Sequence, residues 1–241
     1  MKKILIVTIM LLTAATSFSQ RRGSAPNWLT IAVKGGYGNS IMFSKAISDN
    51  KDLKYDYMAP SYCFGGRLGV VFADVIGVSA EFLGSGFNQQ YTYNNGKVNI
   101  DGKIKYTSTD FLALLRYTGQ YGLYCEIGPK FTFIKSAERE FDNITTDVAD
   151  QYVDKFTSFA FGIGFMPYNG DRVQVSLGVR AAYCSKNVLN TQDNPYGTGS
   201  LLTIENTELK PFSAQIMLEA NYMFARFGRA SCGKGKIIFF D

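Results

Sequence analysis

The stretch RVQVSLGVRAAYCS, residues 172 to 185, alternates between two kinds of side chain at every second position. This two-residue period predicts a β-strand whose two faces differ in polarity. One face is apolar throughout: Val173, Val175, Leu177, Val179, Ala181 and Tyr183. The other face carries two arginines among smaller residues: Arg172, Gln174, Ser176, Arg180 and Cys184.

Seven more segments show the same alternation, and nearly all of them carry charge opposite a wide apolar face. No helix is available to cover these apolar faces, as one would in a soluble sheet protein. Lipid is therefore the simplest cover. The eight predicted strands cover residues 27–39, 61–73, 76–91, 103–117, 121–135, 156–168, 172–185 and 211–227.

Long polar loops alternate with short turns between these strands. The turn Asn169-Gly170 has the strongest hairpin signal, because both residues tolerate positive φ. The long loops are expected at residues 40–60, 92–102, 136–155 and 186–208. The pattern predicts an all-β fold, an eight-stranded antiparallel up-and-down transmembrane β-barrel, with long loops outside and both termini periplasmic.

The first 20 residues have the layout of a secretory signal peptide. Lys2 and Lys3 precede an apolar run at residues 4–12, and small residues then lead to Gln20. After residue 20, no uninterrupted apolar run reaches the roughly 18 residues of a transmembrane helix. The expected domains are a signal peptide over residues 1–20, a barrel over 21–228 and a periplasmic C-terminal tail over 229–241.

The net charge is mild, which argues against nucleic acid as a partner. The full chain carries +5, and removal of Lys2 and Lys3 with the signal peptide leaves +3. Residues 136–155 have a net charge of −4, whereas residues 226–241 have a net charge of +3. The two ends of the barrel should therefore differ in the sign of their charge.

The four cysteines do not predict a disulfide framework. Cys125 is expected on the lipid-facing side, and Cys232 lies in the tail. Cys63 and Cys184 should face inward from strands that are not neighbours. A disulfide between these two across the lumen stays open as an alternative, because it requires close approach of their Cα atoms.

The alternation, the signal peptide and the unequal connections resemble the small outer-membrane barrels of Gram-negative bacteria, of the OmpA and OmpX type. Two glycine-rich strands, VKGGYG at residues 33–38 and FGGRLG at 64–69, are similar to those of outer-membrane β-barrel proteins common in Bacteroidota, including PorT-like proteins. The resemblance covers nearly the whole mature chain. It implies an outer-membrane location and makes secretion or envelope-biogenesis machinery a candidate assembly.

The chain contains no histidine, which excludes several kinds of catalytic and metal site. Ser-His-acid hydrolysis, His-dependent acyl transfer and His-ligated zinc all require that side chain. Asp142, Asp147, Asp150 and Asp154 do not have the spacing of a compact calcium site. We therefore expect no enzymatic activity, no cofactor and no bound metal.

The inward-facing charges form the main candidate site. The interior of an eight-stranded barrel is just wide enough to be filled by side chains, and buried charges must pair. The set therefore favours a salt-bridged plug, and the alternative is a narrow or gated ion path. Five cations face four carboxylates: Lys34, Arg67, Arg116, Lys130 and Arg180 against Glu81, Asp110, Glu126 and Glu219.

The C-terminal tail is the second candidate site. Its apolar run is costly to leave in water and can add to the edge of a sheet. We therefore expect a peptide that docks on a protein partner. The alternatives are a tail that folds back under the barrel mouth and a disordered tail. The docking residues would be Lys234, Lys236, Ile237, Ile238, Phe239 and Phe240.

Together these observations predict a non-enzymatic outer-membrane barrel that acts as a structural or accessory subunit of a larger envelope complex. Its partners would be outer-membrane lipid and a protein bound at the periplasmic tail or the extracellular loops. A narrow or gated channel is the first alternative function. A soluble, lipocalin-like binding barrel is the second.

Overall fold

The computed structural model describes residues 27–44, 51–56, 59–94, 97, 99–119, 121–190, 208–229 and 235–239. The expected signal peptide lies outside these residues. Within them, no helix is both long and apolar enough to cross a membrane.

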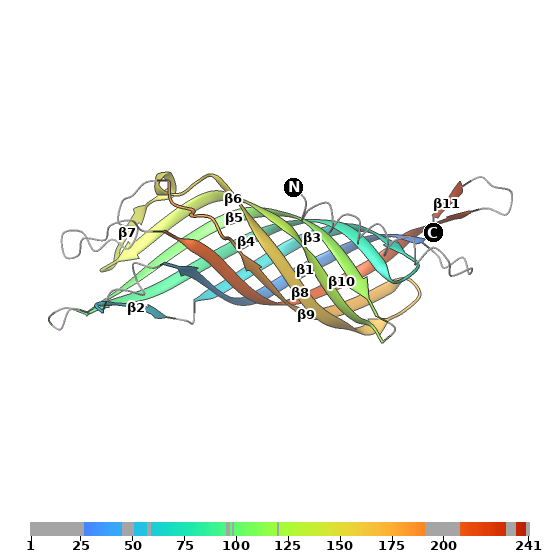
Figure 1. Ribbon diagram of the computed structural model, residues 1–241, viewed down its shortest axis with the longest axis horizontal. Coiled ribbons are helices and arrows are strands. Elements are labelled where there is room, and N and C mark those ends of the chain that lie inside the picture. Colours follow the sequence, from blue (N-terminus) through green and yellow to red (C-terminus); the bar gives the residue numbers. More distant parts are fainter. Residues whose placement is uncertain are drawn as a thin grey trace, which may run out of the picture.

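Eight long antiparallel strands of the described chain close into a ring, which Figure 1 shows from the side. The first strand pairs with the last along its whole length, from Asn27 opposite Phe227 to Phe43 opposite Lys210. The ring therefore has no free edge, and the predicted eight-stranded antiparallel barrel is confirmed. The ring strands are β1 (Asn27–Phe43), β3 (Pro60–Phe72), β4 (Ile76–Asn94), β5 (Asn99–Thr118), β6 (Leu123–Phe141), β8 (Lys155–Asn169), β9 (Val173–Tyr183) and β10 (Lys210–Arg229).

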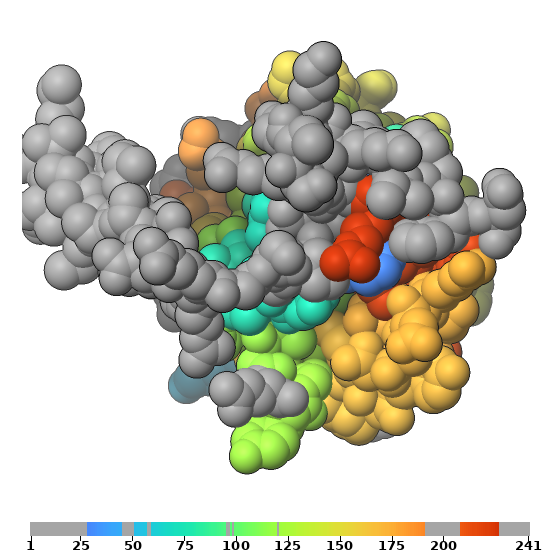
Figure 2. Space-filling model, turned by 90° about the vertical axis from the view of Figure 1, so that its right-hand side faces the viewer, coloured from blue at the N-terminus to red at the C-terminus, as the bar shows by residue number. Residues whose placement is uncertain are grey.

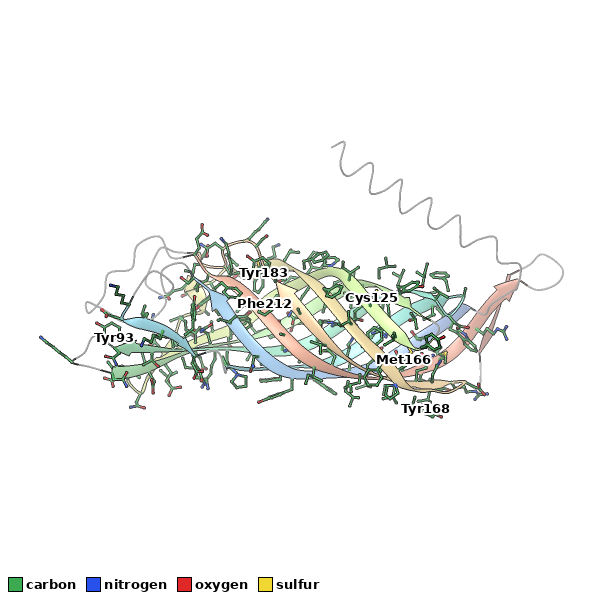
Figure 3. The ribbon with its side chains drawn as sticks, turned by 60° about the horizontal axis from the view of Figure 1, so that its bottom comes forward. Tyr93, Cys125, Met166, Tyr168, Tyr183 and Phe212 are labelled. Atoms are coloured by element: carbon green, nitrogen blue, oxygen red, sulfur yellow. The ribbon has the colours of Figure 1, made fainter. Side chains whose placement is uncertain are left out.

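The outer face of the ring is an apolar belt, as the alternation predicts. Successive Cβ atoms of a strand point to opposite faces, so every second side chain points away from the lumen. In Figure 3, Tyr183 and Phe212 lie toward one end of the belt and Tyr168 toward the other. Exposed apolar side chains of the belt include Ile31, Val33, Phe64, Leu68, Phe82, Leu115, Ile127, Phe161, Ile163, Val179, Ile216 and Leu218.

Three neighbouring strands extend beyond the belt at one end of the barrel. β4, β5 and β6 contain 19, 20 and 19 residues, whereas about 9 to 11 residues of a tilted strand cross a bilayer. Two short strands widen this extension, since β2 (Leu53–Asp56) pairs with β4 and β7 (Ile144–Asp147) pairs with β6. We call these five strands the loop-end sheet, and the end that carries them, on the left of Figure 1, the loop end.

The loop-end sheet corrects the prediction of long loops at residues 92–102 and 136–155. β4 continues to Asn94, β5 begins at Asn99 and β6 continues to Phe141. The outward side chains are polar here because they face water rather than lipid. A polar outer face looks like a loop in sequence, although the period of two continues on the inner face.

The opposite end, which we call the turn end, carries the three short connections. The predicted positive-φ turn at Asn169-Gly170 is wrong: Asn169 is the last residue of β8, the three residues 170–172 connect it to β9, and neither Asn169 nor Gly170 has positive φ. A type I turn needs no positive φ. Among the described non-glycine residues, positive φ occurs instead at Ala73, Asp74, Asp142 and Asn143.

The C-terminal segment joins the barrel sheet. β10 runs to Arg229, the first residue of the expected tail, and β11 (Gly235–Phe239) lies antiparallel to the last five residues of β10. Pairing between β10 and β9 stops at Tyr222, so β11 occupies the edge of β10 that β9 leaves uncovered. In Figure 1 this hairpin projects past the turn end.

Candidate functional site: the filled lumen and its two ends

The nine charged residues predicted to line the lumen all lie on the inner face of the ring. Eight are buried, and Lys130 is partly buried. Each occupies an inward position of the two-residue period. They are Lys34 on β1, Arg67 on β3, Glu81 on β4, Asp110 and Arg116 on β5, Glu126 and Lys130 on β6, Arg180 on β9 and Glu219 on β10.

Seven of the nine form one connected group in the described barrel. Lys34 stands between the three carboxylates of this group: its Nζ lies 2.9 Å from Glu81 Oε1, 2.8 Å from Glu219 Oε2 and 3.5 Å from Glu126 Oε1. We call the group the lumen cluster: Lys34, Arg67, Glu81, Arg116, Glu126, Arg180 and Glu219.

Two arginines join these carboxylates in pairs. Arg180 donates to Glu81 at 2.6 and 3.0 Å and, through Nε, to Glu126 at 2.9 Å. Arg116 donates to Glu126 at 2.7 Å and to the two oxygens of Glu219 at 2.7 and 2.8 Å. Such forked, charge-assisted hydrogen bonds hold both partners in one geometry.

Arg67 and Asn221 complete the lumen cluster beside Glu219. Arg67 Nη1 donates to Glu219 Oε1 at 2.5 Å and to Asn221 Oδ1 at 3.3 Å. Asn221 Nδ2 donates to Glu219 Oε1 at 2.6 Å. Arg67 Nε has no hydrogen-bond partner among the described residues. The pattern places Asn221 inward, but a single inward amide carries no signal that would mark it as part of the cluster.

The charges of the lumen cluster nearly balance, since four cations meet three carboxylates. Buried charges persist only when they are paired and hydrogen-bonded. The cluster ties seven of the eight ring strands together across the lumen. The cluster therefore holds these strands at fixed positions relative to one another.

Asp110 and Lys130 form a separate pair nearer the loop end. Their closest atoms are 2.8 Å apart, and the Lys130 side chain is 19% exposed. Asp110 also accepts hydrogen bonds from Ser85 at 2.5 Å and from Ser108 at 3.4 Å. No group of three or more acidic or cysteine side chains in the described residues is arranged to hold a metal ion.

Buried apolar side chains fill the level between the two charged groups. Along β5, the inward Leu112 and Leu114 lie between Asp110 and Arg116. We call this level the middle layer: Cys63, Leu83, Leu112, Leu114, Ala160, Ala182 and Met217.

The cysteines that the structure describes, Cys63, Cys125 and Cys184, are all free thiols. Cys63 lies in the middle layer with its Sγ 3.9 Å from Met217 Sδ. Cys184 donates to the Thr157 carbonyl at 3.4 Å. The disulfide between Cys63 and Cys184 that the sequence left open is therefore not formed.

A large buried core fills the lumen at the loop end, and the sequence reasoning missed it. Phe87 and Tyr106 stack with ring centroids 4.6 Å apart, and Phe156 meets Tyr106 edge-on. The signal that could have found it is the run of aromatic and aliphatic inward positions beyond the belt. This loop-end core comprises Met42, Leu53, Phe87, Tyr91, Tyr93, Ile104, Tyr106, Ala137, Val148, Tyr152, Phe156, Cys184, Val188, Leu189 and Leu209.

Two connections pack over the loop-end core and hydrogen-bond to each other. The Val153 N–H donates to the Val188 carbonyl at 3.0 Å. The Asn190 N–H donates to the Gln151 carbonyl at 2.7 Å. We call these connections the lid, residues 148–153 and 184–190.

Tyr152 anchors the lid in the loop-end core. Its side chain is almost fully buried, and its backbone bridges to Leu189. Burial raises the pKa of Tyr152 above the ordinary value, so the phenol stays neutral. Its hydroxyl has no hydrogen-bond partner within the described residues.

The predicted docking tail is partly described. Lys234 and Phe240 lie outside the described residues, whereas Lys236, Ile237, Ile238 and Phe239 belong to β11. One edge of β11 pairs with β10, and its other edge pairs with no strand of the described chain. Figure 2 looks onto the turn end and shows part of β10, in red, beside the blue start of β1.

Sequence comparison connects this architecture to a known family. Residues 10–209 match the family model described as "Outer membrane protein beta-barrel domain". No curated protein matches the chain.

Several solved barrels resemble the chain in fold. OprG, an outer membrane protein of Pseudomonas aeruginosa, is 14% identical, with a TM-score of 0.43 over 83% of this chain and 97% of its own. Neisserial surface protein A is 9% identical, with a TM-score of 0.40 over 81% and 97%. Ail, the attachment invasion locus protein of Yersinia pestis, is 12% identical, with a TM-score of 0.34 over 83% and 100%.

Proposed function

Because the chain belongs to the outer membrane protein beta-barrel domain family and lies in the bacterial outer membrane, we propose that it is a closed, non-enzymatic barrel that serves as an accessory subunit of a larger envelope complex. The candidate assembly is secretion or envelope-biogenesis machinery. The outer-membrane location excludes the soluble, lipocalin-like alternative. The apolar belt contacts lipid, so the surfaces left for partners are the two ends.

The filled lumen is the observation that carries this proposal. The lumen cluster, the middle layer and the loop-end core follow one another along the barrel, and the lid packs over the last of them. An ion path would need to displace several ion pairs and a packed aromatic core at once. Breaking a buried ion pair by moving one partner costs about 3 to 5 kcal/mol. A closed barrel is therefore favoured over the channel.

The absence of histidine supports a non-enzymatic role. The buried acids of the lumen cluster all accept hydrogen bonds from cations, which holds them as structural anions. Neither the lid nor the lumen cluster offers an exposed nucleophile next to a base, the arrangement that covalent catalysis needs.

The loop-end sheet is the partner surface that we assign to the outside of the cell. Its outer face carries cross-strand charges, such as Lys105 and Glu140 at 3.6 Å, each more than 40% exposed. β7 is exposed along its whole length, and its Ile144 side chain is 67% exposed. A mixed polar surface with single apolar anchors is typical of non-obligate protein interfaces.

We assign β11 to the periplasmic side as the docking strand. Its unpaired edge can accept a strand from a partner, which is how extended peptides add to an exposed sheet edge. Lys236 on this strand and Arg229 at the end of β10 make the hairpin basic. An acidic partner edge would therefore be steered toward it.

Conductance of the purified protein in planar bilayers tests the closed barrel. We expect no steady conductance from the folded full-length chain. A reproducible single-channel current would favour the channel instead.

Affinity isolation of the full-length chain from native membranes tests the accessory role. The matched experiment deletes residues 230–241, which removes β11 and keeps the ring strands. Loss of the co-isolated proteins from the folded, inserted deletion supports docking by β11, whereas their retention contradicts it.

A further inference from the structure

β7 forms an open edge of the loop-end sheet (Figure 1). It pairs with β6 on one side, and no strand of the described chain pairs with its other side. All four of its residues are exposed. The edge strand on the other side of the sheet, β2, is tied to the barrel instead, because the Tyr55 hydroxyl donates to the Ser44 carbonyl at 3.1 Å. Of these two edges, β7 is therefore the one open to a further strand.

Thr145 and Asp147 direct their backbone groups toward this open edge. In an antiparallel ladder, residues whose N–H and C=O face the paired strand alternate with residues whose N–H and C=O face away from it. The Val148 N–H donates to the Ala137 carbonyl of β6 at 2.9 Å, so every second residue back from Val148 faces β6. The backbone groups of Thr145 and Asp147 consequently point away from β6, where no backbone partner is formed in the described chain.

A pair of like charges lies on the outer face beside this edge. Glu138 of β6 stands directly opposite Asp147 of β7, and both side chains are exposed. Lys105, which the register places on the other side of Glu138, bridges to Glu140 instead. Like charges directly opposite each other destabilise a sheet. A cation on the next strand, opposite Asp147, would relieve this repulsion.

The other face of β7 carries an apolar side chain at the same edge. Ile144 is 67% exposed and lies opposite Phe141 of β6. Phe141 packs against the loop-end core. The apolar row therefore runs from the core to Ile144 and ends in water. A large apolar side chain on a further strand, opposite Ile144, would continue this row.

We propose that the open edge of β7 receives an extended, antiparallel segment of a partner protein outside the cell, basic on one face and apolar on the other. The segment carries lysine or arginine opposite Asp147 and a large apolar side chain opposite Ile144. These positions are three residues apart, so their side chains point to opposite faces of the added strand. Main-chain hydrogen bonds supply affinity and the two side chains supply specificity. The proposal rests on the loop-end sheet being the outward partner surface.

A short fluorescent peptide tests this pairing. It consists of threonine and serine, with one lysine and, three residues later, one leucine, the order that antiparallel pairing requires. Fluorescence anisotropy measures its binding to the full-length protein in non-ionic detergent. We expect saturable binding, and a peptide with glutamate in place of the lysine should bind at least about tenfold more weakly. Equal binding of the two peptides would overturn the proposal.

Asp147→Lys tests the charge from the side of the protein. This variant should reverse the preference, so that the glutamate peptide binds more tightly than the lysine peptide. The matched control is Asp171→Lys, an exposed aspartate at the turn end, which should keep the wild-type preference. An unchanged preference in Asp147→Lys would contradict the pairing of the lysine with Asp147.

Thr145→Pro tests the backbone of the edge. It removes an N–H that faces the added strand and leaves the pairing with β6, so peptide binding should weaken at least about tenfold. Thr145→Val keeps this N–H and should bind as the wild type does. Equal binding by the two variants would overturn the proposal.

Peptide variants decide the same point on the wild-type protein if Thr145→Pro disturbs the hairpin, which hydrogen exchange at the β6 and β7 amides detects. The residue two positions after the lysine lies opposite Thr145 and directs its N–H toward β7. N-methylation of this residue should weaken binding at least about tenfold, whereas N-methylation of the residue before it should not. Equal effects of the two methyl groups would contradict strand addition.

Other occupants of the edge give different results. Strong protection of the Thr145 and Asp147 amides from hydrogen exchange in the free protein would show that this chain covers its own edge. Cross-links between two copies at β7 would show self-pairing. Either result would overturn the proposal. Proteins co-isolated from native membranes that bind Thr145→Pro as well as the wild type would contradict docking at β7 and leave the accessory role standing.

Discussion

At the scale of single residues, Glu219 shows how a charged side chain is kept inside a membrane barrel. It contacts Lys34, Arg67 and Arg116 and also accepts a hydrogen bond from Asn221. These partners come from β1, β3 and β5 and from β10 itself. The carboxylate can remain charged because four donors replace its lost hydration.

Glu219→Leu should strongly destabilise the barrel, because Lys34, Arg67 and Arg116 stay buried but lose the one carboxylate that all three contact. We expect a loss of about 3 to 5 kcal/mol in the free energy of unfolding, measured by urea titration in detergent micelles. The control is Glu140→Leu, which removes the exposed partner of Lys105 and should change stability by no more than about 0.5 kcal/mol. If Glu219→Leu loses no more stability than this control, the lumen charges are hydrated and the lumen is wet.

Tyr152→Phe should stabilise the lid, because it removes a buried hydroxyl that has no partner among the described residues. The expected gain is about 1 kcal/mol at neutral pH. Burial raises the pKa of Tyr152, so the wild type loses stability as pH rises above about 10, where the unfolded phenol ionises. The advantage of the variant should therefore grow at alkaline pH. Urea titrations at neutral and alkaline pH measure it, and a constant difference would contradict the assignment.

At the scale of elements, the same alternation builds two different structures along β4, β5 and β6. Within the belt, the outward positions are apolar and face lipid. Beyond it, Lys103 and Lys105 of β5 stand opposite Glu140 and Glu138 of β6 and face water. On the inner face, the charged lumen cluster fills the barrel within the belt, and the apolar loop-end core fills it beyond the belt.

The β6–β7 hairpin depends on its two-residue turn. Asp142 and Asn143 have φ of 53° and 61°, a left-handed conformation that asparagine tolerates and β-branched residues resist. Asn143→Val should therefore open the hairpin at a cost of about 1 to 2 kcal/mol. Hydrogen exchange at the β7 amides should accelerate while exchange in the belt strands stays unchanged. Thr145→Val on β7 is the control and should leave exchange as in the wild type.

At the scale of the whole molecule, ring closure determines where the two ends of the described chain lie. β1 and β10 pair along their full length, so Asn27 and Phe227 meet at the turn end. The loop-end sheet, the lid and the acidic connection between β6 and β8 all lie at the other end. The molecule is therefore polarised along its long axis (Figure 1).

This polarity predicts which end faces the cell exterior, since outer-membrane barrels place long loops outside and short turns in the periplasm. Thr146→Cys on β7 should react with an impermeant thiol reagent in intact cells, whereas Asn169→Cys at the turn end should not. Both variants need a background in which the native cysteines are replaced. Reaction at residue 169 alone would invert the orientation.

The fold could be predicted because its signal is local and repeated. Each strand carries its own period of two, and a membrane leaves a closed sheet as the solution for such strands. The nine lumen charges could be found for the same reason, since each one is a charged residue at an inward position of its own strand. The loop-end sheet was missed because its outer face meets water, and water-facing strand residues and loop residues have similar composition.

By itself, the sequence determined the number of ring strands, the face that each side chain occupies and the residues that bring charge into the lumen. Only the tertiary structure decided which charges meet, because ion pairs such as Arg67 with Glu219 join residues far apart in the chain whose distance depends on the stagger of the closed ring. It also decided that Asp110 and Lys130 stand apart from the other seven charges. Pairing partners and register are properties of the closed barrel, and no single strand contains them.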